Sequence, residues 1–209
     1  MKDETHKNLL KITCILLIIS IGISITIIYM YHDTQEKLEQ QKSVQINRFV
    51  TNLYNAAADS GRLANKGIEE WIEIIEKKEN DIYNEATYLN RLSASLETVY
   101  SISNLQLIPQ TQFQNYIFRY YLLEAIEINE EFAQLVHKNE GDMNRFVSRL
   151  ESLKLDLNVL SEHLTEEVIK EIADREKTLH NIIEQEIIPN LSDQHRNIIS
   201  DGLLMDSVR

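Results

Sequence analysis

Turn-forming residues are scarce in this sequence, which holds only five glycines and two prolines among its 209 residues. A β-rich fold needs a turn about every 8–12 residues, and such turns rely heavily on Gly and Pro. Seven such residues are too few to form the turns between a series of short strands. The shortage therefore argues against an all-β or α/β architecture and predicts an all-α protein.

Cysteine is nearly absent as well, and the charge is strongly of one sign. The single cysteine, Cys14, has no partner within the chain for a disulfide and offers no cysteine-based metal site. Lys and Arg number 21 against 33 Asp and Glu, which gives a formal net charge of −12. A nucleic-acid-binding surface needs clustered Lys and Arg to release counterions, and no stretch of this sequence has such a cluster. We therefore expect no nucleic-acid partner.

One long stretch near the N-terminus has no charged residue at all. It begins at Ile12 and ends at Tyr31, and at ~1.5 Å of rise per residue a helix of this length crosses a bilayer core of ~30 Å. Lys11 precedes the stretch, and Tyr29 and Tyr31 close it, as is typical of the two membrane interfaces. A cleaved signal peptide has a shorter apolar core, about 7–15 residues, and a small-residue cleavage site behind it. The sequence instead predicts an uncleaved signal-anchor that binds the membrane bilayer.

The predicted anchor divides the chain into three parts and orients them. Residues 1–11 form a short N-terminal tail, residues 12–31 the transmembrane helix, and residues 32–209 an acidic helical-bundle domain. Lysines precede the uncharged stretch, whereas Lys37 and Lys42 behind it lie among acidic residues. The positive-inside bias then favours a single-pass plasma-membrane protein with a cytoplasmic N-terminus and an extracytoplasmic C-terminal domain.

Apolar residues in the remaining sequence recur every three or four positions, which is the period of an amphipathic helix. Helix breakers and caps interrupt this period at Pro109, at Gly141 and Asp142, and at Pro189. Helices with short connections bury their apolar stripes most simply against one another, so we expect an elongated antiparallel bundle. The period predicts helices over residues 46–75, 82–99, 113–135, 143–160 and 168–187, with a short tail helix over 192–205.

Three features of the helical part stay open at this level. Gly61 and Gly67 fall inside the first helix and each costs up to about 1 kcal/mol relative to Ala, so that helix either continues or breaks between residues 59 and 67. Either Ser161 or Thr165 starts the helix that follows residue 160. The absence of a strict heptad seam favours an intramolecular bundle over a parallel coiled coil, with a homo-oligomer as the alternative.

The motifs of common enzyme classes are missing. The sequence has neither the His-Glu-x-x-His of a zinc protease nor the Glu-x-x-His of a di-iron bundle, and it has no Gly-x-Ser-x-Gly and no phosphate-binding glycine loop. Glu176, His180 and Glu184 share one helix face and could offer a metal two or three ligands, but such residues are common on solvated helix faces. We expect no catalytic residue, no metal, no cofactor and no enzyme activity.

The densest aromatic cluster offers a candidate partner surface. Phe118 falls off the stripe formed by its neighbours, which predicts that at least one ring faces outward, and exposed aromatics beside an arginine are typical of binding hot spots. Core packing is the stronger expectation for most of the cluster, because tyrosines in bundles often bury the ring and leave the hydroxyl wet. The cluster comprises Tyr116, Phe118, Arg119, Tyr120 and Tyr121.

These features together favour an interaction or structural protein over an enzyme. The anchor would hold an acidic helical bundle at the membrane, where the bundle binds another membrane or envelope protein. The alternative is an extracytoplasmic sensory or ligand-binding bundle that lacks a second span of its own.

Overall fold

A computed structural model of the chain shows helices throughout the part that it describes. The chain divides into two units, Met1–Val44 and Gln45–Arg209, and each is treated by itself below. The backbone is described for residues 2–77, 79–104, 112–138, 141–173 and 179–206, and the side chains for residues 17, 19–76, 80–104, 116–138, 141–173, 179 and 181–200.

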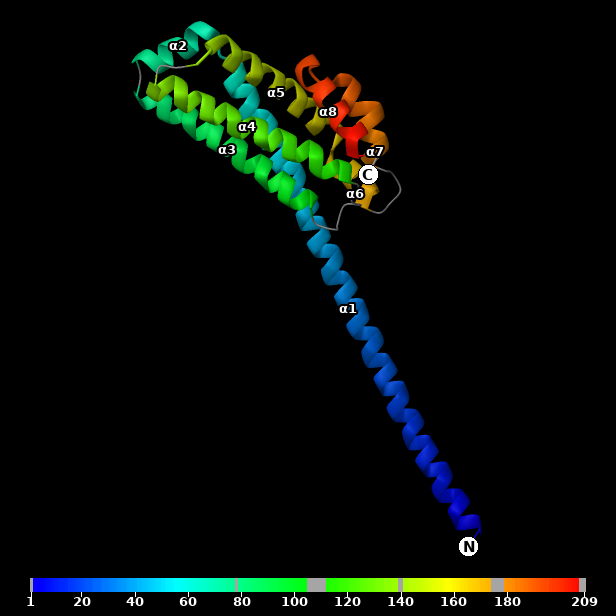
Figure 1. Cartoon of the computed structure of the whole chain (residues 1–209). Coiled ribbons are helices and arrows are strands. Elements are labelled where there is room, and N and C mark those ends of the chain that lie inside the picture. The colour runs from blue at the N-terminus through cyan, green and yellow to red at the C-terminus, as the bar shows by residue number, and fades with distance from the viewer. Residues whose placement is uncertain (1, 78, 105–111, 139–140, 174–178, 207–209) are drawn as a thin grey trace. The chain divides into compact units, whose positions relative to one another are not determined.

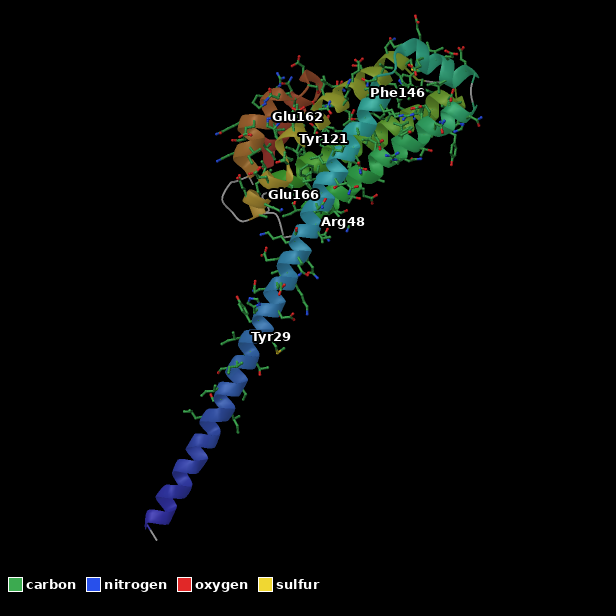
Figure 2. All side chains as sticks on the ribbon, turned by 180° about the vertical axis from the view of Figure 1, so that it is seen from behind. Tyr29, Arg48, Tyr121, Phe146, Glu162 and Glu166 are labelled. Carbon is green, nitrogen blue, oxygen red and sulfur yellow. The ribbon has the colours of Figure 1, made fainter. Side chains whose placement is uncertain are left out.

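The first unit is a single helix, the N-terminal part of α1 (Lys2–Ala64). Its apolar side chains from Leu17 to Tyr31 are at least half exposed wherever they are described, and Figure 2 shows the side chains near Tyr29 pointing away from the helix on different sides. Among the described residues, no helix combines the length and the hydropathy of a membrane span. The predicted span at residues 12–31 lies partly outside them, because described side chains begin at residue 17.

The second unit is a helical bundle, which confirms the all-α prediction (Figure 1). Helices α3 and α4 lie side by side in opposite directions, and α4 also packs against α5 and α8. Beyond the C-terminal part of α1, its elements are α2 (Ile68–Lys77), α3 (Glu79–Ser103), α4 (Gln112–Lys138), α5 (Met143–His163), α6 (Glu166–Ala173), α7 (Leu179–Ile182), the π-helix η1 (Ile183–Ile187), the 3-10 helix η2 (Ile188–Asn190) and α8 (Asp193–Asp206).

The first long helix of the bundle breaks close to the region, residues 59–67, in which the sequence allowed either a break or a continuous helix. Helix α1 ends at Ala64, and α2 begins four residues later at Ile68. The amide of Trp71 donates to the carbonyl oxygen of Gly67 at 3.1 Å, which closes the first turn of the new helix. Two acidic residues, Glu69 and Glu70, lie in that turn and complement the positive end of the helix dipole.

The predicted caps explain the later helix boundaries. Asp142 accepts hydrogen bonds from the backbone amides at positions 144 and 145 at 2.9 and 3.3 Å and so caps α5. Gly141 before it has a φ of +136°, a conformation that a Cβ-bearing residue adopts only with strain. Thr165, rather than Ser161, precedes α6, and its hydroxyl accepts from the amide of Val168 at 3.4 Å. Pro189 lies in η2, where the regular helix has ended as expected.

A cluster of aromatic rings centres the core of the bundle. The ring of Trp71 is fully buried and meets Phe146 edge-on at 5.1 Å and Phe132 at 5.8 Å. Helices α2, α4 and α5 each contribute one of these rings. The cluster therefore joins α2 to the consecutive helices α4 and α5.

Candidate functional site

The most unusual feature of the bundle is a carboxylate buried among several hydrogen-bond donors. Asp156 on α5 has no exposed surface. Its carboxylate accepts from the Tyr121 hydroxyl at 3.0 Å, from the Ser192 amide at 2.6 Å and from the Ser192 hydroxyl at 3.2 Å. The Nδ1 atom of His195 lies 2.6 Å away and must donate, because an ionised carboxylate can only accept. Asp156 thereby ties α4, α5 and the start of α8 together.

The local sequence explains why these groups meet. Asp156 occupies a core position of α5, since it lies three residues after Leu153 and four before Leu160, both of which are fully buried. Ser192 immediately precedes α8, and His195 lies in the first turn of that helix. Asp156 therefore satisfies a backbone donor at the N-terminus of another helix, where negative charge is favourable.

A second buried group, the guanidinium of Arg149, lies beside the first and binds three carboxylates. Its Nε donates to Glu124 at 2.7 Å, and its two terminal nitrogens donate to Glu127 at 2.8 Å and to Glu131 at 3.1 Å. The side chains of Arg149, Glu124 and Glu131 are largely buried, whereas that of Glu127 is 62% exposed and its pair is screened by solvent. The pairs with Glu124 and Glu131 therefore matter most.

His195 connects the two groups. Its Nε2 lies 3.8 Å from the Oε1 of Glu124, which is a charge contact and too long for a hydrogen bond, and no hydrogen-bond partner for Nε2 lies within the described residues. The rings of Tyr120 and Tyr121 pack against its imidazole with centroids 5.5 and 6.0 Å away. We call Tyr121, Glu124, Arg149, Asp156 and His195 the charge network.

The network favours the charged forms of His195 and Glu124. Burial opposes the imidazolium, but the hydrogen bond to Asp156 and the nearby carboxylate of Glu124 outweigh it and raise the pKa of His195 to about 9. Burial likewise opposes the carboxylate of Glu124, but His195 and the hydrogen bond from Arg149 lower the pKa of Glu124 to about 2. At neutral pH the network therefore contains a buried imidazolium between two carboxylates.

Two clefts of about 270 Å³ each open beside the charge network. Glu127, Arg145 and Arg149 line both of them. Tyr120 adds an aromatic wall to one, and Asp142 adds a carboxylate to the other. Charged side chains therefore form a large part of both linings.

The structure separates the five residues of the predicted partner surface. Phe118 and Tyr121 are buried, Tyr116 and Tyr120 are partly exposed, and Arg119 is exposed. The expectation that the ring of Phe118 faces outward is wrong, because that ring meets Phe49 of α1 edge-on at 5.3 Å. Helix α4 is covered on more than one side, so residues off its main apolar stripe are also buried.

Comparison with protein family models, curated proteins and solved structures finds no match to this chain. The metal ligands considered at Glu176, His180 and Glu184 cannot be assessed together, because Glu176 and the side chain of His180 lie outside the described residues. Elsewhere in the described part, no group of three His, Cys, Asp or Glu side chains is arranged to hold a metal ion.

Sequence reasoning missed the charge network, although one signal was present. An aspartate at an apolar-stripe position of α5 is a conflict between residue type and burial, and such conflicts mark buried polar sites. Nothing in the sequence paired Asp156 with His195, because the two residues are 39 positions apart.

Proposed function

We propose that this chain is a membrane-anchored helical interaction protein whose bundle binds another membrane or envelope protein. Residues 12–31 form the anchor, and the bundle lies on the extracytoplasmic side. The observation that carries the proposal is the apolar surface of α1 in the first unit. Exposed Leu, Ile, Met and Tyr side chains there need an apolar environment that water does not supply.

The geometry of that segment supports lipid as the environment. Ile19, Ile21 and Ile23 are exposed. At about 100° per residue Ile19 and Ile23 lie on one face of the helix and Ile21 lies on the opposite one, so the apolar surface is not confined to a single face. The hydroxyls of Ser24 and Thr26 donate to carbonyl oxygens four residues earlier, each at 2.9 Å. The polar groups of these side chains are thus satisfied within the helix, as a bilayer requires.

The exposed part of the aromatic cluster supports a protein partner. Tyr116, Arg119, Tyr120 and Leu123 follow the i, i+3, i+4 and i+7 spacing of one helix face on α4, and Arg119 and Leu123 are exposed. We call these four residues the α4 face. Aromatic and arginine side chains side by side are enriched in binding hot spots.

The alternative, a ligand-binding ectodomain, is supported only by the two clefts. Each holds about 270 Å³, just below the ~300–1,000 Å³ that small-molecule sites usually occupy. Their charged side chains are largely paired with one another, which leaves few groups to recognise a ligand. The interaction protein is therefore the stronger proposal.

The anchor is tested by introducing charged residues into the uncharged stretch, residues 12–31. The full chain is expected to stay in the membrane pellet after alkaline carbonate extraction. The double substitution Ile21→Lys and Ile23→Lys should shift most of it to the soluble fraction, because each lysine near the centre of a span costs about 2.5–3.5 kcal/mol. Leu38→Lys with Val44→Lys, at exposed positions of α1 outside the run, is the control and should stay in the pellet. Release of the unaltered chain by carbonate would refute the anchor.

The partner is tested by site-specific photocrosslinking in cells of the source organism. A photoreactive residue at position 119 should give one discrete adduct with a membrane protein, and Leu123→Ala should weaken that adduct severalfold. The control probe replaces Tyr83 on α3, which is 75% exposed and lies outside the α4 face. If position 119 yields no adduct, or position 83 yields the same one, the α4 face is not the binding surface.

A further inference from the structure

The N-terminal part of helix α8, over residues 193–200, contacts the bundle mainly through polar groups. Among its described side chains, at residues 193–200, only His195 and Ile199 are buried. Ser152 of α5 donates to Gln194 at 3.0 Å, and the hydroxyl of Tyr116 on α4 donates to the carbonyl oxygen of Ile198 at 3.4 Å. Little apolar surface at these residues contacts the bundle, so the attachment of this N-terminal part of α8 depends strongly on the contacts of His195.

We propose that the proton on His195 latches α8 onto α4 and α5, and that losing this proton releases α8 and uncovers the rings of Tyr120 and Tyr121. The geometry that carries this is the position of a buried imidazole between Asp156 at 2.6 Å and Glu124 at 3.8 Å. The latch is a property of the folded bundle and does not depend on the partner proposed above.

The charged and titratable groups around the imidazole come from three sides. Helix α4 contributes Glu124 and the two tyrosines whose rings contact the imidazole, and α5 contributes Asp156. Arg149, also from α5, reaches the ring only through Glu124. The 3-10 helix η2 packs against α8 with Ile188, Pro189 and Asn190, none of which titrates.

Among the described side chains of α8, the charged residues other than His195 are Asp193 and Arg196, which pair with each other at 3.1 Å. No other cation in the described part contacts Asp156, so the imidazolium alone balances its charge.

Loss of the proton changes one side of the ring more than the other. A neutral imidazole keeps its Nδ1 hydrogen and the bond to Asp156, but Nε2 then presents a lone pair to the carboxylate of Glu124. The attraction on that side becomes a repulsion, and two buried carboxylates lose the positive charge between them. The closed state therefore weakens while the released state, in which water solvates the ring, does not.

The direction and size of the pH effect follow from linkage. The pKa of His195 is about 9 in the closed state and should return to its ordinary value of 6.5 when α8 is released. The latch is fully closed below pH 6.5 and weakens as the pH rises toward 9. The ratio of released to closed α8 should rise about a hundredfold over that interval.

Native-state hydrogen exchange of the full chain in detergent micelles measures this release. Exchange rates are divided by the intrinsic rates at each pH from 6.5 to 9, and the measurement is repeated at several low urea concentrations. Amides of α8 should exchange through a local opening that is insensitive to urea and about a hundredfold more populated at pH 9. Amides of α3 should exchange only through urea-sensitive, global unfolding.

Two variants sharpen the result. His195→Gln cannot be protonated, so α8 should exchange rapidly at every pH. His163→Gln is the control, because the His163 ring contacts the Val159 carbonyl oxygen of its own helix and should leave the exchange of α8 unchanged.

If α8 and α3 share one exchange free energy and one urea dependence in the unaltered chain, α8 does not open locally and the latch is refuted. A local opening whose population is the same at pH 6.5 and 9 also refutes it. Both results are readable without His195→Gln, should that variant fail to fold.

Discussion

Replacing Arg149 with methionine is expected to lower the free energy of unfolding of the bundle by about 3–5 kcal/mol, the cost of removing one partner from a buried ion pair. Glu124 and Glu131 would then remain buried without the guanidinium that now hydrogen-bonds them at 2.7 and 3.1 Å. Glu127 is mostly exposed and can turn to water. Methionine retains much of the aliphatic volume of arginine, so the loss of unfolding free energy reflects the missing charge and not a new cavity.

Urea titration of the full chain in micelles, followed by tryptophan fluorescence, measures this loss. Trp71 is the only tryptophan and is fully buried in the core, so its emission reports unfolding directly. Arg145→Met is the matched control, because Arg145 is 66% exposed and its contact with Glu131 is long, at 3.9 Å. The control should lose no more than about 1 kcal/mol. Equal losses for the two variants would show that the carboxylates do not depend on Arg149.

The helices of the bundle could be predicted from the sequence because their signals are local. The apolar period of each segment survives in the structure, and residues such as Asp142 and Thr165 cap the helices that follow them. The break between α1 and α2 could be narrowed only to residues 59–67. Gly61 lies within α1, whereas Gly67 lies immediately before α2, and no local rule distinguishes the two glycines.

The charge network could not be predicted because its partners are distant in sequence. In the sequence Arg149 is one of several cations on its helix. The role of Asp156 is visible only when folding brings Ser192, just before α8, and His195, in its first turn, to the carboxylate. The prediction for the ring of Phe118 failed for a similar reason. A prediction from a single amphipathic stripe assumes that only one face of the helix is covered, whereas α4 contacts helices on several sides.

Asp156→Asn is expected to cost about 3–5 kcal/mol at pH 6.5, because it removes the charge that faces the imidazolium and turns a donor toward other donors. The amide keeps one oxygen for the Ser192 amide or for the Tyr121 hydroxyl, and cannot serve them and His195 as the carboxylate does. Urea unfolding at fixed salt measures the loss. Asp193→Asn, at a 94% exposed position of α8, is the control and should lose less than about 1 kcal/mol.

The pH dependence of this variant separates charge from packing. Because the pKa of His195 is raised to about 9 in the folded protein, its stabilisation is complete below pH 6.5 and is lost as the pH rises toward 9, at most about 3 kcal/mol in all. Asp156→Asn removes the largest cause of that raised pKa, so the unaltered protein should lose stability over this interval while the variant changes much less. The two unfolding free energies should therefore converge at alkaline pH. A constant gap between them from pH 6.5 to 9 would mean that Asp156 acts through shape and hydrogen bonding alone, and that the proton on His195 contributes nothing to holding α8.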